Sequence, residues 1–278
     1  MAHSNQAAPW QATAAYLYVL RLDATDLAWE YLRRHPDYRA CWRNADHQTT
    51  KAVSAWGLAR LENPTLDARQ AHPVWDERLP ALLHLRAAHP SEWLADEMVD
   101  AAADSDAGLN LWHIPGRKDL TVLPGGLALQ ARDGARCLRA RLDAGVLAGA
   151  PAQCVVPLDT RLHAQAALLA THAAQLAPRR ASTARAVART AHAVANTIRV
   201  SQASLRHLRA LQALDGLRAG ASQRRITEVL YGPDRVREEW QADSALRAQL
   251  RHSLARAWAL MRGGYLGLAG LRHAAPDE

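Results

Sequence analysis

Two glycines and two serines delimit a pair of helices between residues 201 and 232. Ser201 can cap a long helix that ends at Gly220, because glycine tolerates the positive φ usually found just after a helix. Ser222 can cap a short second helix, which Gly232 and Pro233 end. Ile226, Val229 and Leu230 would form its buried stripe. This order is typical of the first two helices of a helix-turn-helix unit, although many helical hairpins share it.

A third helix is expected from Ser244 to about Met261, after a turn of about residues 232–243 in which Trp240 would be a packing anchor. At 100° per residue its apolar side chains fall on one arc of about 120°, the width of a core-facing stripe. They are Leu246, Leu250, Leu254, Ala257, Trp258 and Met261. The opposite arc carries basic and small side chains and no acid, namely Ser244, Ala248, Arg251, His252, Ala255, Arg256 and Ala259, with Arg247 on the flank. That composition suits a helix that enters the major groove of DNA.

Charge is distributed unevenly along the chain. The whole sequence has 34 Lys and Arg against 27 Asp and Glu, a formal net charge of +7. Residues 179–278 hold 17 Arg against 8 acids, whereas residues 1–178 are slightly acidic. A coding bias toward arginine would not remove acids from one end, so the asymmetry favours a polyanionic partner such as nucleic acid. The alternative is a solvated basic face on a helical tail.

The first 62 residues are rich in aromatic side chains and predict a small helical domain. A helix can begin near Asp23–Asp26 and must stop at His35, because Pro36 disfavours helical geometry in the residue before it. A second helix follows from Pro36. Packing in a core is the favoured interpretation of the aromatic residues. Contact with another domain or partner is the alternative for Trp29, Tyr31 and Tyr38.

The middle of the chain predicts mixed structure. Short helices are expected at Leu79–Leu85 and Glu92–Val99, within a connecting segment 63–108. Apolar pieces cut by turn signals, beginning with Leu109–Ile114 and including an Asp133-Gly134 hairpin signal, predict a small antiparallel β module at 109–158. Residues 159–278 form the last domain, with helical spacing over 162–177. Residues 179–200 suit either an exposed basic helix or a linker. The expected fold is thus mainly α with a small antiparallel β module.

Several stretches resemble known families. Residues 220–232 (Gly-Ala-Ser-Gln-Arg-Arg-Ile-Thr-Glu-Val-Leu-Tyr-Gly), 244–247 (Ser-Ala-Leu-Arg) and 263–268 (Gly-Gly-Tyr-Leu-Gly-Leu) resemble the DUF2285 family, and residues 29–39 resemble the DUF6499 domain. The resemblance implies an extended-turn helix-turn-helix that binds DNA on one face and docks on the N-terminal domain with the other. It also implies kinship with FseA-type transcriptional activators of integrative and conjugative elements. Leu266 departs from the pattern, which has Arg there.

Catalysis and cofactors have no support in the sequence. It contains no Gly-x-Ser-x-Gly, Walker or Gly-x-Gly-x-x-Gly signature, and its thirteen histidines and three cysteines show no zinc-type spacing. No export signal or apolar span is visible, which predicts a soluble, cytoplasmic, nucleoid-associated protein without a membrane partner.

We therefore expect a DNA-binding transcriptional activator for genes of mobile-element excision and transfer. Its partners would be double-stranded DNA, and by implication RNA polymerase and a DUF2285-type antiactivator. The expected DNA contacts are Arg224, Arg225, Ser244, Arg247, Arg251, His252 and Arg256. The alternative is an antiactivator-type regulator that binds another regulatory protein and not DNA.

Overall fold

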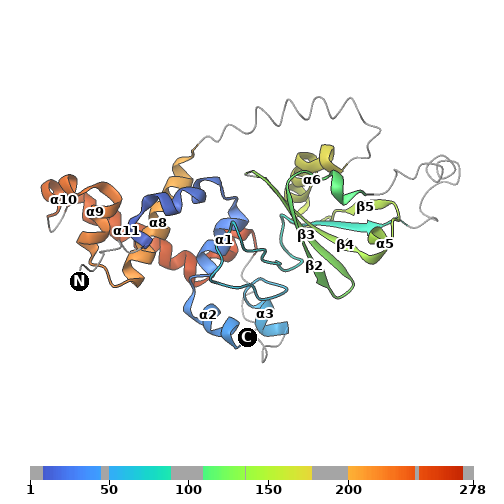
Figure 1. Cartoon of the computed structure of the whole chain (residues 1–278), viewed down its shortest axis with the longest axis horizontal. Coiled ribbons are helices and arrows are strands. Elements are labelled where there is room, and N and C mark those ends of the chain that lie inside the picture. Colours follow the sequence, from blue (N-terminus) through green and yellow to red (C-terminus); the bar gives the residue numbers. More distant parts are fainter. Residues whose placement is uncertain are drawn as a thin grey trace, which may run out of the picture. The chain divides into compact units, whose positions relative to one another are not determined.

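The computed structural model describes residues 9–44, 50–88, 109–134, 136–176, 200–241 and 244–271. These residues form two compact units. The first takes in the described residues of 1–57, 61–73 and 199–278, and the second those of 58–60 and 74–198. The first unit thus joins the two ends of the sequence, whereas the second is built from its middle (Figure 1). The predicted helix at Glu92–Val99 and almost all of 179–200 lie outside the described residues.

The second unit contains a mixed five-stranded sheet in the order β2-β3-β4-β1-β5. Its strands are β1 (Leu83–Ala87), β2 (Arg117–Leu123), β3 (Gly126–Asp133), β4 (Arg136–Asp143) and β5 (Ala152–Val155). The hairpin turn predicted at Asp133-Gly134 is confirmed, because β3 and β4 pair antiparallel from Gly126↔Asp143 to Asp133↔Arg136. The expectation of a purely antiparallel module is wrong, because β1 pairs parallel with β4.

Two local predictions in this region are also wrong. The helix predicted at Leu79–Leu85 does not form: residues 79–82 are turn and irregular backbone, and Leu83 begins β1, which buries Leu83 and Leu85 against the sheet core. A short apolar run is compatible with a helix or a strand, and here backbone pairing with β4 on one side and β5 on the other favours the strand. Leu109–Ile114 supplies the 3₁₀ turn η5 (Leu111–His113) instead of a strand.

The core of the second unit lies on one face of the sheet. Leu129, Leu138 and Ala140 are buried there, and Leu168 and Leu169 of α6 (Leu162–Leu176) pack against them. The short helix α5 (Ala144–Leu147) follows β4 and begins where the Asp143 side chain accepts a hydrogen bond from Val146 N. The helical spacing predicted over 162–177 is therefore confirmed as α6.

The N-terminal part of the first unit is helical. It comprises the 3₁₀ helices η1 (Pro9–Gln11) and η2 (Thr13–Arg21), then α1 (Ala24–Leu32), α2 (Pro36–Arg43) and α3 (Thr50–Ser54). Asp23 caps α1 by accepting a hydrogen bond from Asp26 N, and Pro36 begins α2, both as predicted.

The C-terminal part contains the predicted series of capped helices. They are α8 (Gln202–Arg218), α9 (Gln223–Tyr231), α10 (Pro233–Glu239), α11 (Ala245–Ala259), a π-helical turn η6 (Leu260–Gly264) and α12 (Tyr265–Ala269). Gly220 and Gly232 have φ of 78° and 94°, as their positions after α8 and α9 require. The predicted turn of residues 232–243 contains α10, because Pro233 at a first helical position starts a new helix.

The two parts of the first unit share one core. Trp10 of η1 is buried in a cluster with Ala213 of α8, Ile226 of α9, and Leu250 and Leu254 of α11. α1 packs against α8 and α12, so the blue N-terminal helices lie against the orange and red C-terminal ones (Figure 1). Within the described residues, no helix is long and apolar enough to cross a membrane.

Candidate nucleic-acid interface

The helix α11 has one buried and one exposed face, and the side chain of the residue before it caps its amino end. The Ser244 hydroxyl accepts a hydrogen bond from Arg247 N at 3.3 Å. The predicted inner stripe is confirmed for Leu246, Leu250, Leu254, Ala257 and Met261, which are all at most 7% exposed. Trp258, the sixth predicted member, is only half-buried and lies 4.9 Å from the Arg262 guanidinium.

The opposite face of α11 is basic. Arg251, His252 and Arg256 are exposed, and no ion pair joins any of them to a carboxylate within the described ranges. Ser244 is half-buried at the amino end. The face therefore presents the Arg251 and Arg256 guanidinium groups about one and a half turns apart, with neither neutralised by a carboxylate among the described residues.

Arg247 lies at the edge of this face and differs from the others. Its guanidinium carbon is 5.4 Å from the centroid of the Trp240 ring, and its Nε is buried with no hydrogen-bond partner among the described residues. Trp240 itself packs against the cluster around Trp10, which confirms it as the expected packing anchor. Stacking on an indole fixes the guanidinium and leaves its outer N–H groups available for a ligand.

Arg224 and Arg225 occupy the first turn of α9, which the Ser222 hydroxyl caps. Both are paired with Glu228, at 3.5 and 3.2 Å, and their side chains are 59% and 52% exposed. Exposed pairs of this kind contribute only about 0–1 kcal/mol, so a phosphate can replace the carboxylate at small cost. The pair carries one net positive charge with Glu228 included.

Trp29, Tyr31 and Tyr38, for which the sequence offers core packing or a contact with another domain or partner, are fully buried. The Trp29 Nε1–H donates to the Leu66 carbonyl at 3.2 Å, and the Tyr38 hydroxyl donates to the Glu62 carbonyl at 2.7 Å. Tyr31 reaches the C-terminal part of the unit, where its hydroxyl lies 2.9 Å from His207 Nδ1 on α8. Burial raises the pKa of Tyr31 and lowers that of His207, which the positive charge of Arg256 lowers further.

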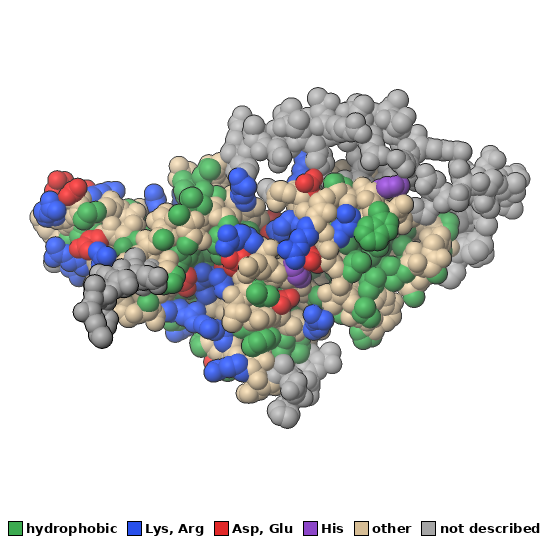
Figure 2. Space-filling view, viewed as in Figure 1, with side chains coloured by type: hydrophobic (Ala, Val, Ile, Leu, Met, Phe, Trp, Pro, Cys, Tyr) green, Lys and Arg blue, Asp and Glu red, His purple; other side chains and the backbone are tan. Residues whose placement is uncertain are grey.

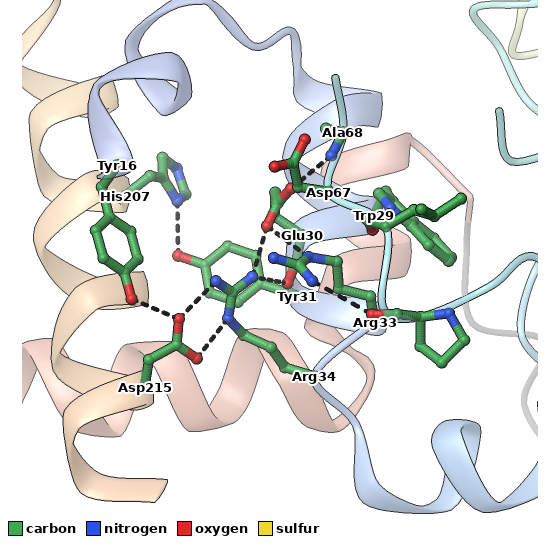
Figure 3. Close-up of polar contacts among 12 residues, drawn as sticks. Tyr16, Trp29, Glu30, Tyr31, Arg33, Arg34, Asp67, Ala68, His207 and Asp215 are labelled. Atoms are coloured by element: carbon green, nitrogen blue, oxygen red, sulfur yellow. Dashed lines mark hydrogen bonds and ion pairs between the residues drawn. The ribbon is translucent and has the colours of Figure 1, made fainter. Parts of the chain in front are cut away.

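A buried ion cluster joins the same two parts of the chain (Figure 3). The Arg34 guanidinium, whose side chain is 5% exposed, donates to Glu30 Oε2 on one side and to both carboxylate oxygens of Asp215 on the other, at 2.6 to 2.8 Å. The Tyr16 hydroxyl also donates to Asp215, at 2.8 Å. We call Glu30, Arg34 and Asp215 the Arg34 clamp.

Electrostatics keep the acids of the Arg34 clamp charged. Burial alone would raise the pKa of Glu30, but the positive charges of Arg34 and Arg33 lower it overall. Burial likewise works against the charged form of Asp215, and Arg34 and the Tyr16 hydroxyl bring its pKa below the usual value. A buried charge is tolerated only with such partners.

Sequence reasoning missed both Trp10 and the Arg34 clamp. One signal was present: on a helical wheel of α8, Asp215 lies within the buried arc, between Leu208 and Leu211. A lone acid on a buried arc needs a cationic partner, but α8 alone does not show which arginine supplies it.

Comparison with protein families gives two matches. Residues 155–269 match a family described as "T6SS, Transcription factor, DNA binding domain", and residues 9–60 match one described as "Proteobacterial transcriptional regulator-like domain". No curated protein matches the chain. The first match contains all seven residues expected at the DNA interface, and the second contains Trp10 and Arg34. The chain is therefore similar at both ends to transcriptional regulators, and its C-terminal part corresponds to a DNA-binding domain.

Proposed function

We propose that this protein is a sequence-specific transcriptional activator that reads DNA with α11. In this proposal α8, α9 and α11 form a helix-turn-helix unit in which α10 occupies an extended turn. The observation that carries the proposal is the exposed, unneutralised basic face of Arg251, His252 and Arg256 on a helix whose other face is buried. The match to a transcription-factor DNA-binding domain supports it.

The residues have distinct roles in this proposal. Arg251, His252 and Arg256 read base edges in the major groove, where a guanidinium can pair with guanine through two hydrogen bonds. Arg224 and Arg225 hold a phosphate at the amino end of α9, and Ser244 and stacked Arg247 contact the backbone beside α11. The small residues Ala248 and Ala255 let the helix approach the groove.

The activator role and the mobile-element targets rest on the resemblance to DUF2285 and FseA-type regulators. An antiactivator that binds only another regulator would have no use for a cationic outer face on α11. Chromatin immunoprecipitation from a host strain checks the targets, and transcription in vitro with RNA polymerase checks the sign of regulation.

The DNA-reading role is tested with the variant Arg251→Ala. A duplex selected by the wild-type protein from a random pool serves as the probe. Loss of one base contact should weaken binding to this duplex by about 1–3 kcal/mol, roughly five- to 150-fold, and relax sequence preference at one position. Arg78→Ala removes the same charge from an arginine of the second unit that is 59% exposed, and it should leave binding unchanged. Equal binding by wild type and Arg251→Ala would remove Arg251 from the interface.

A further inference from the structure

The N-terminal helix α2 carries cations at the end of α8 that precedes α9. The chain passes from Arg34, which is held on Asp215 of α8, directly into α2 at Pro36. Arg39 lies in the first turn of α2, five residues after Arg34, and Arg218 lies about one turn after Asp215 on α8. The Arg34–Asp215 ion pair thus fixes the start of α2 against the last turn of α8.

Arg39, Arg43 and Arg218 are exposed, and Arg39 is near enough to Arg218 for its positive charge to act on that guanidinium. Arg39 and Arg43 are four residues apart and so lie on one face of α2. The acid of α2, Asp37, is about 200° around the helix from Arg39. Figure 2 shows blue side chains gathered over the part of the first unit where Figure 1 places α2.

The nearby acids do not neutralise these arginines. Asp215 and Glu30 are occupied by Arg34 and Arg33, and no carboxylate pairs with Arg39, Arg43 or Arg218 in the part of the chain that the structure describes. Partial burial lowers the pKa of Arg218, and the positive charge of Arg39 lowers it further. The fold thus holds the positive charges of Arg39 and Arg218 near each other, and an anionic partner would relieve the repulsion between them.

We propose that Arg39, Arg43 and Arg218, the α2–α8 patch, bind phosphates of the same DNA that α11 reads. Arg218 and the Arg224–Arg225 pair stand on either side of the short turn at Gly220, so the patch continues the phosphate contacts expected at the start of α9. The N-terminal domain then contributes directly to DNA affinity. This inference rests on the proposed DNA-binding function.

DNA phosphate is favoured over an acidic protein as the occupant because of this continuity. A cationic side chain on a phosphate releases counterions, so each contact adds about 0.9 to the slope of log K against log salt concentration. The contacts carry no base information, so they contribute on any duplex. These two properties provide the test.

The experiment measures binding of the full-length chain to a fluorescein-labelled duplex of random sequence, about 30 base pairs long, by anisotropy at several salt concentrations. The variant R39A/R43A/R218A should lower the slope by about 2 to 3 and weaken binding at about 0.1 M salt by up to about 500-fold. R39K/R43K/R218K keeps the charge and should retain most of the slope. R60A/R78A/R117A removes three exposed arginines of the second unit and should bind as wild type does.

The outcomes separate this inference from the proposed function. If the wild type does not bind duplex DNA at low salt, the proposed function fails. If the wild type binds, Arg251→Ala weakens binding to the selected duplex, and R39A/R43A/R218A leaves the slope unchanged, only the inference fails. Urea unfolding of each variant checks the fold. Should the triple variant be unstable, the single variants R39Q and R43Q on exposed α2 positions decide, because each should lower the slope by about 1.

Discussion

At the scale of single residues, the Arg34 clamp is the most consequential interaction. Arg34 and Glu30 are almost completely buried, and Asp215 is partly so, with a side chain 25% exposed. Such clusters add little net stability over an apolar packing, but removal of one member leaves charges buried without a partner. The clamp therefore selects one arrangement of α1 against α8.

Loss of the central cation should be severe. We expect Arg34→Met to lower the free energy of unfolding by about 3–5 kcal/mol, since Glu30 and Asp215 then remain buried without it. Urea denaturation followed by circular dichroism measures the change. Arg237→Met, which breaks a pair with Asp234 that is 74% and 79% exposed, should change it by at most about 1 kcal/mol. Similar small losses in both variants would show that the clamp is dispensable.

His207 should make stability depend on pH. Burial, and secondly the positive charge of Arg256, lower the pKa of His207 in the folded state. As pH falls through the ordinary value of 6.5, His207 is therefore protonated in the unfolded chain but still neutral in the folded chain. Stability should therefore fall as pH drops from about 7 through 6.5 and below, with a contribution of at most about 1.4 kcal/mol per pH unit.

This pH dependence can be assigned by substitution. In His207→Gln, the free energy of unfolding between about pH 7.5 and 5.5 should fall less than in the wild type. His35, whose pKa burial also lowers, remains as background in both proteins. The acids of the Arg34 clamp act in a lower window: their lowered pKa values add stability that is lost only as pH falls below about 4. Parallel curves for the two proteins would exclude His207 as the titrating group.

At the scale of elements, η1 completes the core of the C-terminal helices. A Cβ atom on Gly216 would lie 2.9 Å from Trp10 Cε3 and 3.0 Å from Ile226 Cγ1, so α8 has a glycine where the indole and α9 approach it closely. The Gln212 amide also donates to the Trp10 carbonyl at 3.0 Å. Trp10 is thus held by packing and by a hydrogen bond.

Removal of this indole should destabilise helices that lie about 200 residues away. We expect Trp10→Ala to cost about 3–5 kcal/mol of unfolding free energy, the usual effect of deleting a buried aromatic side chain. Thermal and urea unfolding of the full chain measure it. Trp112, which is 85% exposed, offers the matched control: Trp112→Ala should change stability by no more than about 0.5 kcal/mol. Equal effects would contradict the role given to Trp10.

Elements defined by local chemistry are predictable from the sequence. The caps at Asp23, Ser201, Ser222 and Ser244 place their helices, because a capping side chain acts within three residues. The buried stripe of α11 follows from periodicity, and so does its basic face. These features need no knowledge of distant segments.

Elements defined by distant partners are not predictable in this way. β1 is a strand because β4 and β5 lie beside it, and α10 forms inside a segment that its sequence predicts to be a turn. Trp10 has the pattern of a core residue of a separate small domain, yet it packs against α8, α9 and α11. The partner of Arg34 is 181 residues away, so no local pattern links the two.

At the scale of the whole molecule, the first unit is one folding body made from two distant stretches of sequence. The segments matched by the two regulator families contribute to a single core there. Cutting the chain at the family boundaries would leave each half with an exposed apolar face. The unit should therefore behave as one cooperative structure.

Dividing the chain tests this unity. A fragment of residues 200–278 alone should show no cooperative unfolding transition. Its core lacks Trp10, and its Asp215 lacks the hydrogen bonds from Tyr16 and Arg34. Co-expression with a fragment of residues 1–73 should restore a cooperative transition and give a complex that co-purifies. Calorimetry and circular dichroism measure both. A lone C-terminal fragment as stable as the intact chain would contradict the shared core.

The sequence separation within the Arg34 clamp also has a consequence for biosynthesis. The ribosome adds about 5–20 residues per second, so Asp215 is made about 9 to 36 seconds after Arg34. Throughout that interval, Trp10 and the Glu30–Arg34 ion pair lack the C-terminal helices that bury them in the folded protein. Newly translated molecules can therefore complete the core of the first unit only after the C-terminal helices have emerged from the ribosome.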